Sequence, residues 1–403
     1  MDLSTFLCQE FERDSHILSI NQIDPLYISE IAPAEHRGRL VTWAEIGINV
    51  GLVLGFCSGL IFYNVDDTLE WRLMFVMGCI MPLLMIVLAQ FVMPESPRYL
   101  VSKGQTEEAK EILTKLHPEG YDVDPIVRDI QEALERERLA EKTVGWHMIF
   151  FPTPAIRRML IVGVGTAVAQ QITGIDAIQY YLIDLLQESG ISNDKEQLGL
   201  LVGLGVLKLA FIFVGSRLFD KRGRKPLFYV SLTGMMIALI LVSLTFLDST
   251  HMGSGWVIGG LALYLSAFSV AMGPGAWLIP SEVFATSIRA KAMSLASFSN
   301  RVTAAILSST FLSLVNAITW GGFFLTLAAI CFLVIVFMYF LLPETKGKTL
   351  EEMSLYFAEI TGDDSILKAE QKILAKRCPT IPVEMEFDSE SSDDESELQE
   401  SSP

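Results

Sequence analysis

The sequence predicts an all-α integral membrane protein. Three observations support this prediction: 51% of the 403 residues are hydrophobic, only 19% are charged, and the mean hydropathy is +0.42. With 24 Phe, 10 Tyr and 6 Trp among so few charges, the chain has too little polar surface for a water-soluble globule. Lipid is therefore the expected solvent, and the apolar residues should be gathered into membrane spans.

Apolar stretches recur along the chain, and eight of them are long enough to cross about 30 Å of hydrocarbon, which takes about 20 helical residues. We expect these spans at 41–62, 71–93, 159–187, 198–219, 226–247, 256–284, 290–315 and 320–342. Connections rich in Lys and Arg alternate with acidic or neutral ones. By the positive-inside rule, this alternation predicts that both termini are cytoplasmic.

Two parts of the chain differ from the spans in composition. The segments TEEAKEILTKL and DPIVRDIQEALERERLAEKTV carry apolar residues at three-to-four spacing with charges between them, which predicts an amphipathic helical domain on the cytoplasmic face. Near the C-terminus, LEEMSLYFAEI predicts one short helix, and the Ser, Glu and Asp after it favour disorder. We therefore expect an N-terminal segment at 1–24, a membrane region at 25–93, a helical linker domain at 94–156, a six-helix region at 157–342 and an acidic tail at 343–403.

Charge and cysteine usage exclude several classes of function. The net charge is −17, and nine acidic residues with no basic one lie between Glu384 and Pro403, so a nucleic-acid partner is not expected. The five cysteines are scattered without a CxxC pair, which predicts neither a disulfide framework nor a zinc site. No nucleophile–base arrangement, metal-ligand spacing or phosphate-binding loop is present in the sequence. We therefore expect no enzyme activity, catalytic residue, metal or cofactor.

Short polar motifs lie at the ends of the predicted spans. They are PLYISEIAPAEHRG (25–38), MPESPRYL (93–100), QQITGIDA (170–177), LFDKRGRKP (218–226), GPGAWLIPSE (273–282) and LPETKGKTLEEM (342–353). In this order and spacing they resemble the motifs of the sugar porter family of the major facilitator superfamily. Further segments, EIGINVG (45–51), FPTPAIRR (151–158), GVLK (205–208) and NRVTAAILSSTFLSLVNAITWGGFFL (300–325), are most similar to plant-type polyol and monosaccharide proton symporters.

The resemblance extends from about Pro25 to Met353 and implies the major facilitator fold, with about eight of its usual twelve transmembrane helices. It aligns the first whole span with the family's fifth. Residues 25–93 would then be the remnant of an N-terminal bundle, truncated by its first three spans and most of the fourth, and 157–342 would be the C-terminal six-helix bundle. An incomplete gene model is one explanation of this alignment.

The function implied by the resemblance is transmembrane transport of a small polyol or monosaccharide by alternating access. In the full-length form this transport would be proton-coupled symport. The partners would be the sugar or polyol, protons and the lipid bilayer of a plasma or vacuolar membrane. A non-transporting sugar sensor or regulatory membrane protein on the same scaffold is the alternative.

Three ionisable residues, Glu45, Asp176 and Lys208, fall inside apolar spans. An ionised group at that depth costs about 3 kcal/mol unless it faces a polar cavity or a partner. We expect them to point inward, with Lys208 paired to Glu45 or Asp176. The resemblance places all three where sugar porters contact substrate, and buried ions that serve packing alone are the alternative.

Four uncharged residues complete the expected substrate site. The amides of Gln170 and Gln171 match the alternating hydroxyls of a polyol, although helix-to-helix hydrogen bonding is the alternative. Trp277 follows a Gly-Pro-Gly break and could stack on a sugar ring, or belong to an interfacial belt. Asn300 resembles a pocket-lining Asn of the family, while Arg301 stands where glucose carriers have Trp.

A charged network is expected at the cytoplasmic face, where the resemblance implies ion pairs between bundles that separate during transport. Ordinary interfacial charge is the alternative. The residues concerned are Glu30, Arg37, Glu95, Arg98, Asp220, Arg224, Glu282, Arg289 and Glu344.

Overall fold

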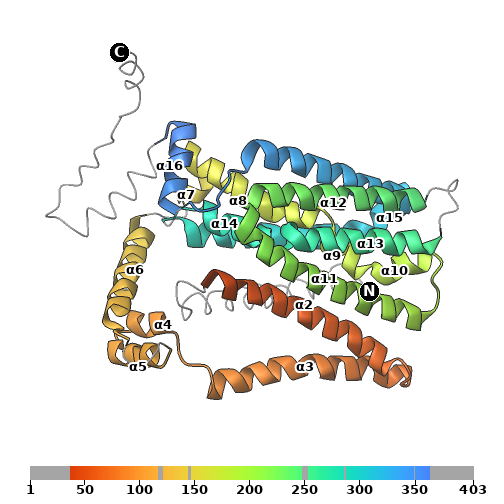
Figure 1. Ribbon diagram of the computed structural model, residues 1–403, viewed down its shortest axis with the longest axis horizontal. Helices are drawn as coiled ribbons and strands as arrows, with labels where there is room; N and C mark the ends of the chain where they lie inside the picture. Colours follow the sequence, from red (N-terminus) through yellow and green to blue (C-terminus); the bar gives the residue numbers. More distant parts are fainter. Residues whose placement is uncertain are drawn as a thin grey trace, which may run out of the picture.

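The computed structural model describes residues 37–116, 121–143, 147–246, 253–285, 287–348 and 350–363. Within these ranges every regular element is a helix, which confirms the all-α prediction (Figure 1). The expected N-terminal segment 1–24, Glu30 and the tail beyond 363 lie outside the described residues. The domain boundaries given above stay a prediction.

The first two helices lie along one side of the molecule. Helix α2 (Arg37–Phe62) packs against α11, and α3 (Asp67–Phe91) packs against α2 on the side away from the main bundle (Figure 1). None of the residues in the most apolar stretch of α3 is buried within the described structure. In a protein that crosses a membrane, such a helix presents its side chains to lipid or to another apolar helix surface.

A small helical unit follows, at the left of Figure 1. It consists of α4 (Pro97–Ser102), α5 (Thr106–Leu116) and α6 (Asp124–Thr143), and the bounds of α5 and α6 agree with the amphipathic segments predicted from the sequence. Lys110 of α5 and Asp124 of α6 form an ion pair at 2.9 Å. The unit has its own apolar core of Leu100, Val101, Ala109, Leu113, Val123 and Val127. We call the end of the bundle that carries this unit the linker face, and the opposite end the far face.

The main bundle contains the large apolar core, to which α8 and α11–α15 contribute. After the single turn α7 (His147–Phe150), its elements are α8 (Pro154–Ile172), α9 (Ile175–Tyr180), α10 (Leu182–Glu188), α11 (Asp194–Arg222), α12 (Arg224–Thr245), α13 (Ser254–Ala267), the π-helix η1 (Phe268–Met272), α14 (Gly273–Val283) and α15 (Arg289–Leu341).

The eight predicted spans all correspond to helices in the structure. By length and composition, six helices of the described residues could cross a membrane, and a shorter apolar stretch, Ile46–Phe62, belongs to α2. The 53-residue helix α15 contains two predicted spans. They meet at Thr319, which has the non-helical angles φ 65° and ψ 163°. The chain reverses at this residue, so one long element crosses the bundle twice.

Two predicted spans are broken, which the apolar pattern alone did not show. The span expected at 159–187 divides into α8, α9 and α10. The first break is at Gly174, whose φ of 94° is a conformation that a residue with a Cβ rarely adopts, and the second is at Tyr181. The span expected at 256–284 widens into η1 before Pro274, which has no backbone N–H to continue the helical ladder. The breaks at Gly174 and before Pro274 lie beside the candidate site.

A final helix covers the linker face of the bundle. Helix α16 (Leu350–Thr361) packs against α8 and α14, with Met353 and Phe357 buried in the main core. The carboxylate of Asp363 accepts a hydrogen bond at 3.3 Å from the backbone N–H of Ala155, in the first turn of α8. A negative charge at a helix N-terminus is favourable, so this contact helps to hold α16 in place.

Candidate functional site

Three side-chain amides interlock between α8 and α15. The Nδ2 of Asn300 donates to the Oε1 of Gln170 at 2.9 Å and to the carbonyl of Ala167 at 2.7 Å. The Nε2 of Gln171 donates to the Oδ1 of Asn300 at 3.4 Å, and the Nε2 of Gln170 donates to the carbonyl of Gly273 at 2.9 Å. All three amides are buried. The structure therefore brings Gln170, Gln171 and Asn300 together, and their role in binding a substrate stays a prediction.

The two Gln side chains have different surroundings. Both polar atoms of the Gln170 amide have hydrogen-bond partners, so it serves the helix contact that the sequence left as an alternative. In contrast, the Oε1 of Gln171 is buried and has no partner among the described residues. A buried carbonyl oxygen without a partner costs about 1–3 kcal/mol, so it is a strong acceptor for an incoming hydroxyl.

The break at Gly174 lies directly after these amides and is stabilised by side chains. The hydroxyl of Thr173 donates to the carbonyl of Gln170 at 2.7 Å, and the carbonyl of Thr173 accepts the hydroxyl of Tyr264 at 3.0 Å. Tyr264, from α13, is fully buried. Because a backbone carbonyl freed inside an apolar region needs a partner, Tyr264 makes this break possible.

The ionisable residues of the site are held around α9. Asp176 lies 3.8 Å from the guanidinium of Arg301 on α15, and each side chain is 22% exposed. Lys208 on α11 donates to the Oε1 of Gln179 at 2.8 Å, and its ammonium lies 5.8 Å from the centre of the Phe268 ring, within cation–π range. The short helix α9 is thus connected to α15 on one side and to α11 on the other.

The charge pair expected between Lys208 and Glu45 or Asp176 is not tested by these contacts. Arg301 is one partner of Asp176, and Gln179 is one partner of Lys208. The backbone of Glu45 belongs to α2, which packs along the helix that carries Lys208 (Figure 1). The Glu45 side chain lies outside the described residues, so a Lys208–Glu45 pair stays a prediction.

Trp277 lies in α14, four residues after the carbonyl that Gln170 binds, and is half-buried. At the break before Trp277, the hydroxyl of Ser231 on α12 bonds two backbone groups. It donates to the carbonyl of Ala267 at 2.6 Å and accepts from the N–H of Met272 at 3.3 Å. With the π-turn fixed in this way, the start of α14 is held against α8 and the amide cluster.

A second polar cluster ties three elements together at the linker face. Arg224, the first residue of α12, forms a two-point ion pair with Glu282 near the end of α14: Nη2 to Oε1 at 2.6 Å and Nε to Oε2 at 3.2 Å. The hydroxyl of Thr345 donates to the same carboxylate. Glu344 accepts the backbone N–H groups of Arg224 and Lys225, each at 3.0 Å.

For the other residues of the expected charged network, the structure gives the exposure of some side chains and does not describe the rest. Glu95 and Arg289 are exposed, and Arg98 is half-exposed at the start of α4. The side chains of Arg37 and Asp220 lie outside the described residues. The contacts of Arg224, Glu282 and Glu344 given above lie within the main bundle, so ion pairing between bundles stays a prediction.

Glu344 occupies the N-terminus of α12, where helix N–H groups favour an anion. Burial alone would raise the pKa of this carboxyl. The backbone N–H donors of Arg224, Lys346 and Lys225, together with the charge of Arg224, outweigh burial and hold the pKa below its ordinary value of 4.5. The carboxylate therefore stabilises the folded protein.

We expect Glu344→Gln to lower the melting temperature near neutral pH and to flatten its dependence on acid pH. Because the folded-state pKa is lowered, the contribution of the carboxylate is present above the ordinary pKa and is lost as pH falls through the folded-state value. The difference in melting temperature between parent and variant should therefore close on acidification. Glu188→Gln, at an exposed position of α10, is the control. A difference that stays constant in acid would contradict this assignment.

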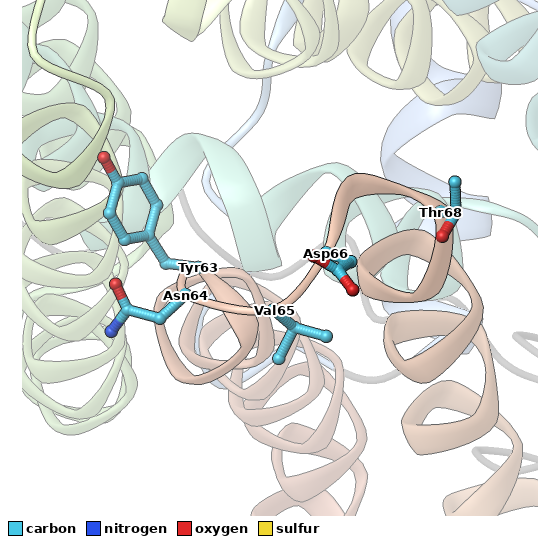
Figure 2. A pocket seen from close by; sticks show the side chains of 5 residues that line it. All are labelled: Tyr63, Asn64, Val65, Asp66 and Thr68. Atoms are coloured by element: carbon cyan, nitrogen blue, oxygen red, sulfur yellow. The ribbon is translucent and has the colours of Figure 1, made fainter.

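A hollow of about 460 Å³ lies at the far face, at the turn between α2 and α3. Figure 2 shows its lining of Tyr63, Asn64, Val65, Asp66 and Thr68, which all belong to the turn and the adjoining helix ends. It contains none of the candidate residues. The amide cluster and the residues around α9 therefore remain the candidate site.

Comparison with known proteins identifies the family. A family model described as "Sugar (and other) transporter" matches residues 19–357. The chain belongs to this family. It is a family of transporters within the major facilitator superfamily, so the chain is a multi-pass membrane protein and the predicted fold class is confirmed.

Two named plant relatives and two solved structures illustrate the similarity. Probable polyol transporter 4 of Arabidopsis thaliana is 39% identical over 340 residues, which cover 83% of this chain and 64% of that protein. Polyol transporter 5 of the same plant is 34% identical over 362 residues, covering 85% and 67%. The chain thus spans about two thirds of the length of these relatives.

The solved structures are of the xylose transporter XylE. The proton:xylose symporter XylE bound to 6-bromo-6-deoxy-D-glucose superposes with a TM-score of 0.67 at 31% identity, covering 83% of this chain and 70% of that one. An inward-open conformation of XylE from E. coli gives a TM-score of 0.66 at 28% identity, covering 82% and 68%.

Sequence reasoning left several residues of the site without a role. Tyr264 and Gln179 were not singled out, although a Tyr in the middle of an apolar span and a Gln three residues after an intramembrane Asp are both unusual enough to have been noticed. Arg301 was noticed only as a departure from glucose carriers. Its contact with Asp176 makes it part of the site.

Proposed function

We propose that the protein carries a small polyol or monosaccharide across a membrane by alternating access. The observation that carries this proposal is the buried amide cluster of Gln170, Gln171 and Asn300, in which the Oε1 of Gln171 lacks a partner beside two breaks in the helices. Amides and guanidinium groups offer the donors and acceptors that match vicinal hydroxyls. A half-buried Trp277 adds an apolar face for the carbon skeleton.

The names of the relatives support a polyol as the substrate, since the two plant proteins are named as polyol transporters. Arg301 supports the same substrate class. A guanidinium donates hydrogen bonds in a planar fork, which suits two neighbouring hydroxyls better than the apolar face of a sugar ring. Proton-coupled symport in the full-length form is part of the proposal and is supported by the similarity to a proton:xylose symporter.

Alternating access fits the arrangement of the breaks. Helix α9 follows a glycine hinge at Gly174, about which it would move relative to α8, and its Asp176 and Gln179 contact α15 and α11. With the linker unit on the cytoplasmic side, as the positive-inside rule predicts, both termini are cytoplasmic and the far face is extracellular or vacuolar.

The pocket assignment is tested by Gln171→Ala and Trp277→Ala. Removing the Gln171 amide should weaken polyol binding by about 1 kcal/mol or somewhat more, which is about fivefold to tenfold in Kd. Trp277→Ala should also weaken binding through loss of stacking. Gln187→Ala, at an exposed position of α10, is the control. Calorimetric titration of the purified protein with sorbitol and glucose measures the change.

Uptake distinguishes the carrier from a sensor. Labelled sorbitol and glucose are offered to transport-deficient cells that express the full-length form, with and without a protonophore. We expect uptake that the protonophore abolishes. Binding without uptake would favour the non-transporting sensor, and unchanged binding by both variants would contradict the pocket assignment.

A further inference from the structure

The buried polar atoms without hydrogen-bond partners are concentrated on one side of the main bundle. Six such side-chain atoms occur among the described residues, and four of them belong to α8 and the first half of α15: Gln171 Oε1, Arg301 Nε, Ser308 Oγ and Ser309 Oγ. Buried polar groups in folded proteins are nearly always paired. Four together on facing helices therefore point to a polar ligand that binds along them.

Two of the three atoms on α15, those of Arg301 and Ser308, lie on one face of the helix, and Ser309 points about 100° away from Ser308. Arg301 and Ser308 are seven residues apart, so at about 100° per residue they differ by only about 20° around the axis and by about 10 Å along it. Ser309 is the next residue. Ala304 and Ala305, which lie between Arg301 and Ser308, have short side chains, and Ala304 is buried.

Helix α9 runs beside the same interval of α15. At one end Asp176 lies 3.8 Å from Arg301, and at the other the Tyr181 hydroxyl donates to the carbonyl of Ser308 at 3.2 Å. The Tyr181 ring stacks on Phe311 with 4.5 Å between ring centres. Residues 301 and 308 of α15 are therefore both held by contacts to the segment that follows the glycine hinge. Ser308 is 7% exposed and lies toward the far face.

We propose that Ser308 and Ser309 form a second hydroxyl-binding subsite, which takes one end of an extended open-chain polyol while Gln171 and Arg301 bind the other end. A serine hydroxyl both donates and accepts, as one end of a polyol requires. Arg301 and Ser308 are about 10 Å apart along α15, a distance that an extended hexitol can span. A tetritol or a pyranose ring is too short to reach both residues. This inference rests on the proposed function and narrows its substrate class to long acyclic polyols.

The proposal is tested with Ser308→Ala, Ser309→Ala and the double variant, by calorimetric titration of the purified chain with sorbitol, erythritol and glucose. Each single change should raise the Kd for sorbitol about fivefold and the double change about 25-fold, which corresponds to about 1 kcal/mol for each hydrogen bond. The Kd values for erythritol and glucose should stay within about twofold of the parent's. Ser294→Ala, whose exposed hydroxyl already bonds the carbonyl of Ala290, is the control.

A second measurement separates ligand binding from packing. Because neither serine hydroxyl has a partner, its removal should leave the melting temperature of the ligand-free protein unchanged or raised. A marked fall in that temperature would assign the hydroxyls to packing and overturn the subsite. So would unchanged sorbitol binding, or an equal loss for all three compounds. If the parent binds none of the three, the proposed function fails, and the subsite fails with it.

Discussion

Gly215→Ala is expected to destabilise the protein more than any other single-methyl change in α11. Gly215 is buried where α11 crosses the π-helix η1, and a Cβ at this position would lie 2.4 Å from the carbonyl oxygen of Val270 and 2.9 Å from that of Ser269. Both obstacles are backbone atoms, so no side-chain rotation can relieve the clash. The two helices would have to separate.

The size of the effect follows from overpacking energies. Inserting a methyl group into a packed core costs about 1–3 kcal/mol, and a clash with backbone belongs at the upper end. With an unfolding entropy of about 2.1 cal/mol/K for each of the 403 residues, about 3 kcal/mol corresponds to a fall in melting temperature of about 3–4 °C. Thermal unfolding of the purified protein, followed by tryptophan fluorescence, measures it.

The same helix provides a matched control for this prediction. Gly203 is exposed, and a Cβ there would meet no atom within 4 Å. Gly203→Ala should therefore melt with the parent or slightly above it, because alanine is the better helix former. Equal melting temperatures for Gly215→Ala and Gly203→Ala would contradict the close approach of α11 and η1.

The spans could be predicted from the sequence, because crossing a membrane requires a run of apolar residues of fixed length. The Gly-Pro-Gly break before Trp277 could also be predicted, whereas the break at Gly174 could not. Gly174 is one of several glycines in apolar helices, and only the left-handed conformation that it adopts shows that the span ends there. The residue with positive φ at the other turn is Thr319 rather than a glycine, so the pattern gave two spans but not the conformation between them.

The candidate site was predictable as a set of residues but not as a set of contacts. An amide or an ion inside an apolar span is costly, so Gln170, Gln171, Asp176 and Lys208 could be recognised from composition alone. Which groups meet depends on how each helix is rotated about its axis. Arg301 lies close to Asp176, and the amide of Gln170 donates to the Gly273 carbonyl at the start of α14, neither of which the sequence specified.

The second large effect is expected at the Arg224–Glu282 ion pair. Their side chains are only 16% and 21% exposed, and the guanidinium contacts both carboxylate oxygens. Glu282→Ala would leave a largely buried arginine without this partner and would also remove the acceptor of the Thr345 hydroxyl. Breaking one partner of a buried pair costs about 3–5 kcal/mol, and the remaining exposure puts this site at the lower end of that range.

A thermodynamic cycle separates the pair from its surroundings. We expect Arg224→Gln and Glu282→Gln each to lower the melting temperature, and the double variant to lose less than the sum of the two, because neither charge is then left unpaired. The coupling should be about 1–3 kcal/mol.

Salt provides the matching check on the same pair. A largely buried pair is screened weakly, so the coupling should persist at high ionic strength, whereas that of the exposed Lys115–Glu111 pair of α5 should vanish. Strict additivity of the two glutamine variants would show that Arg224 and Glu282 stabilise α12 and α14 separately, and the two helices would then be held together by their apolar contacts alone.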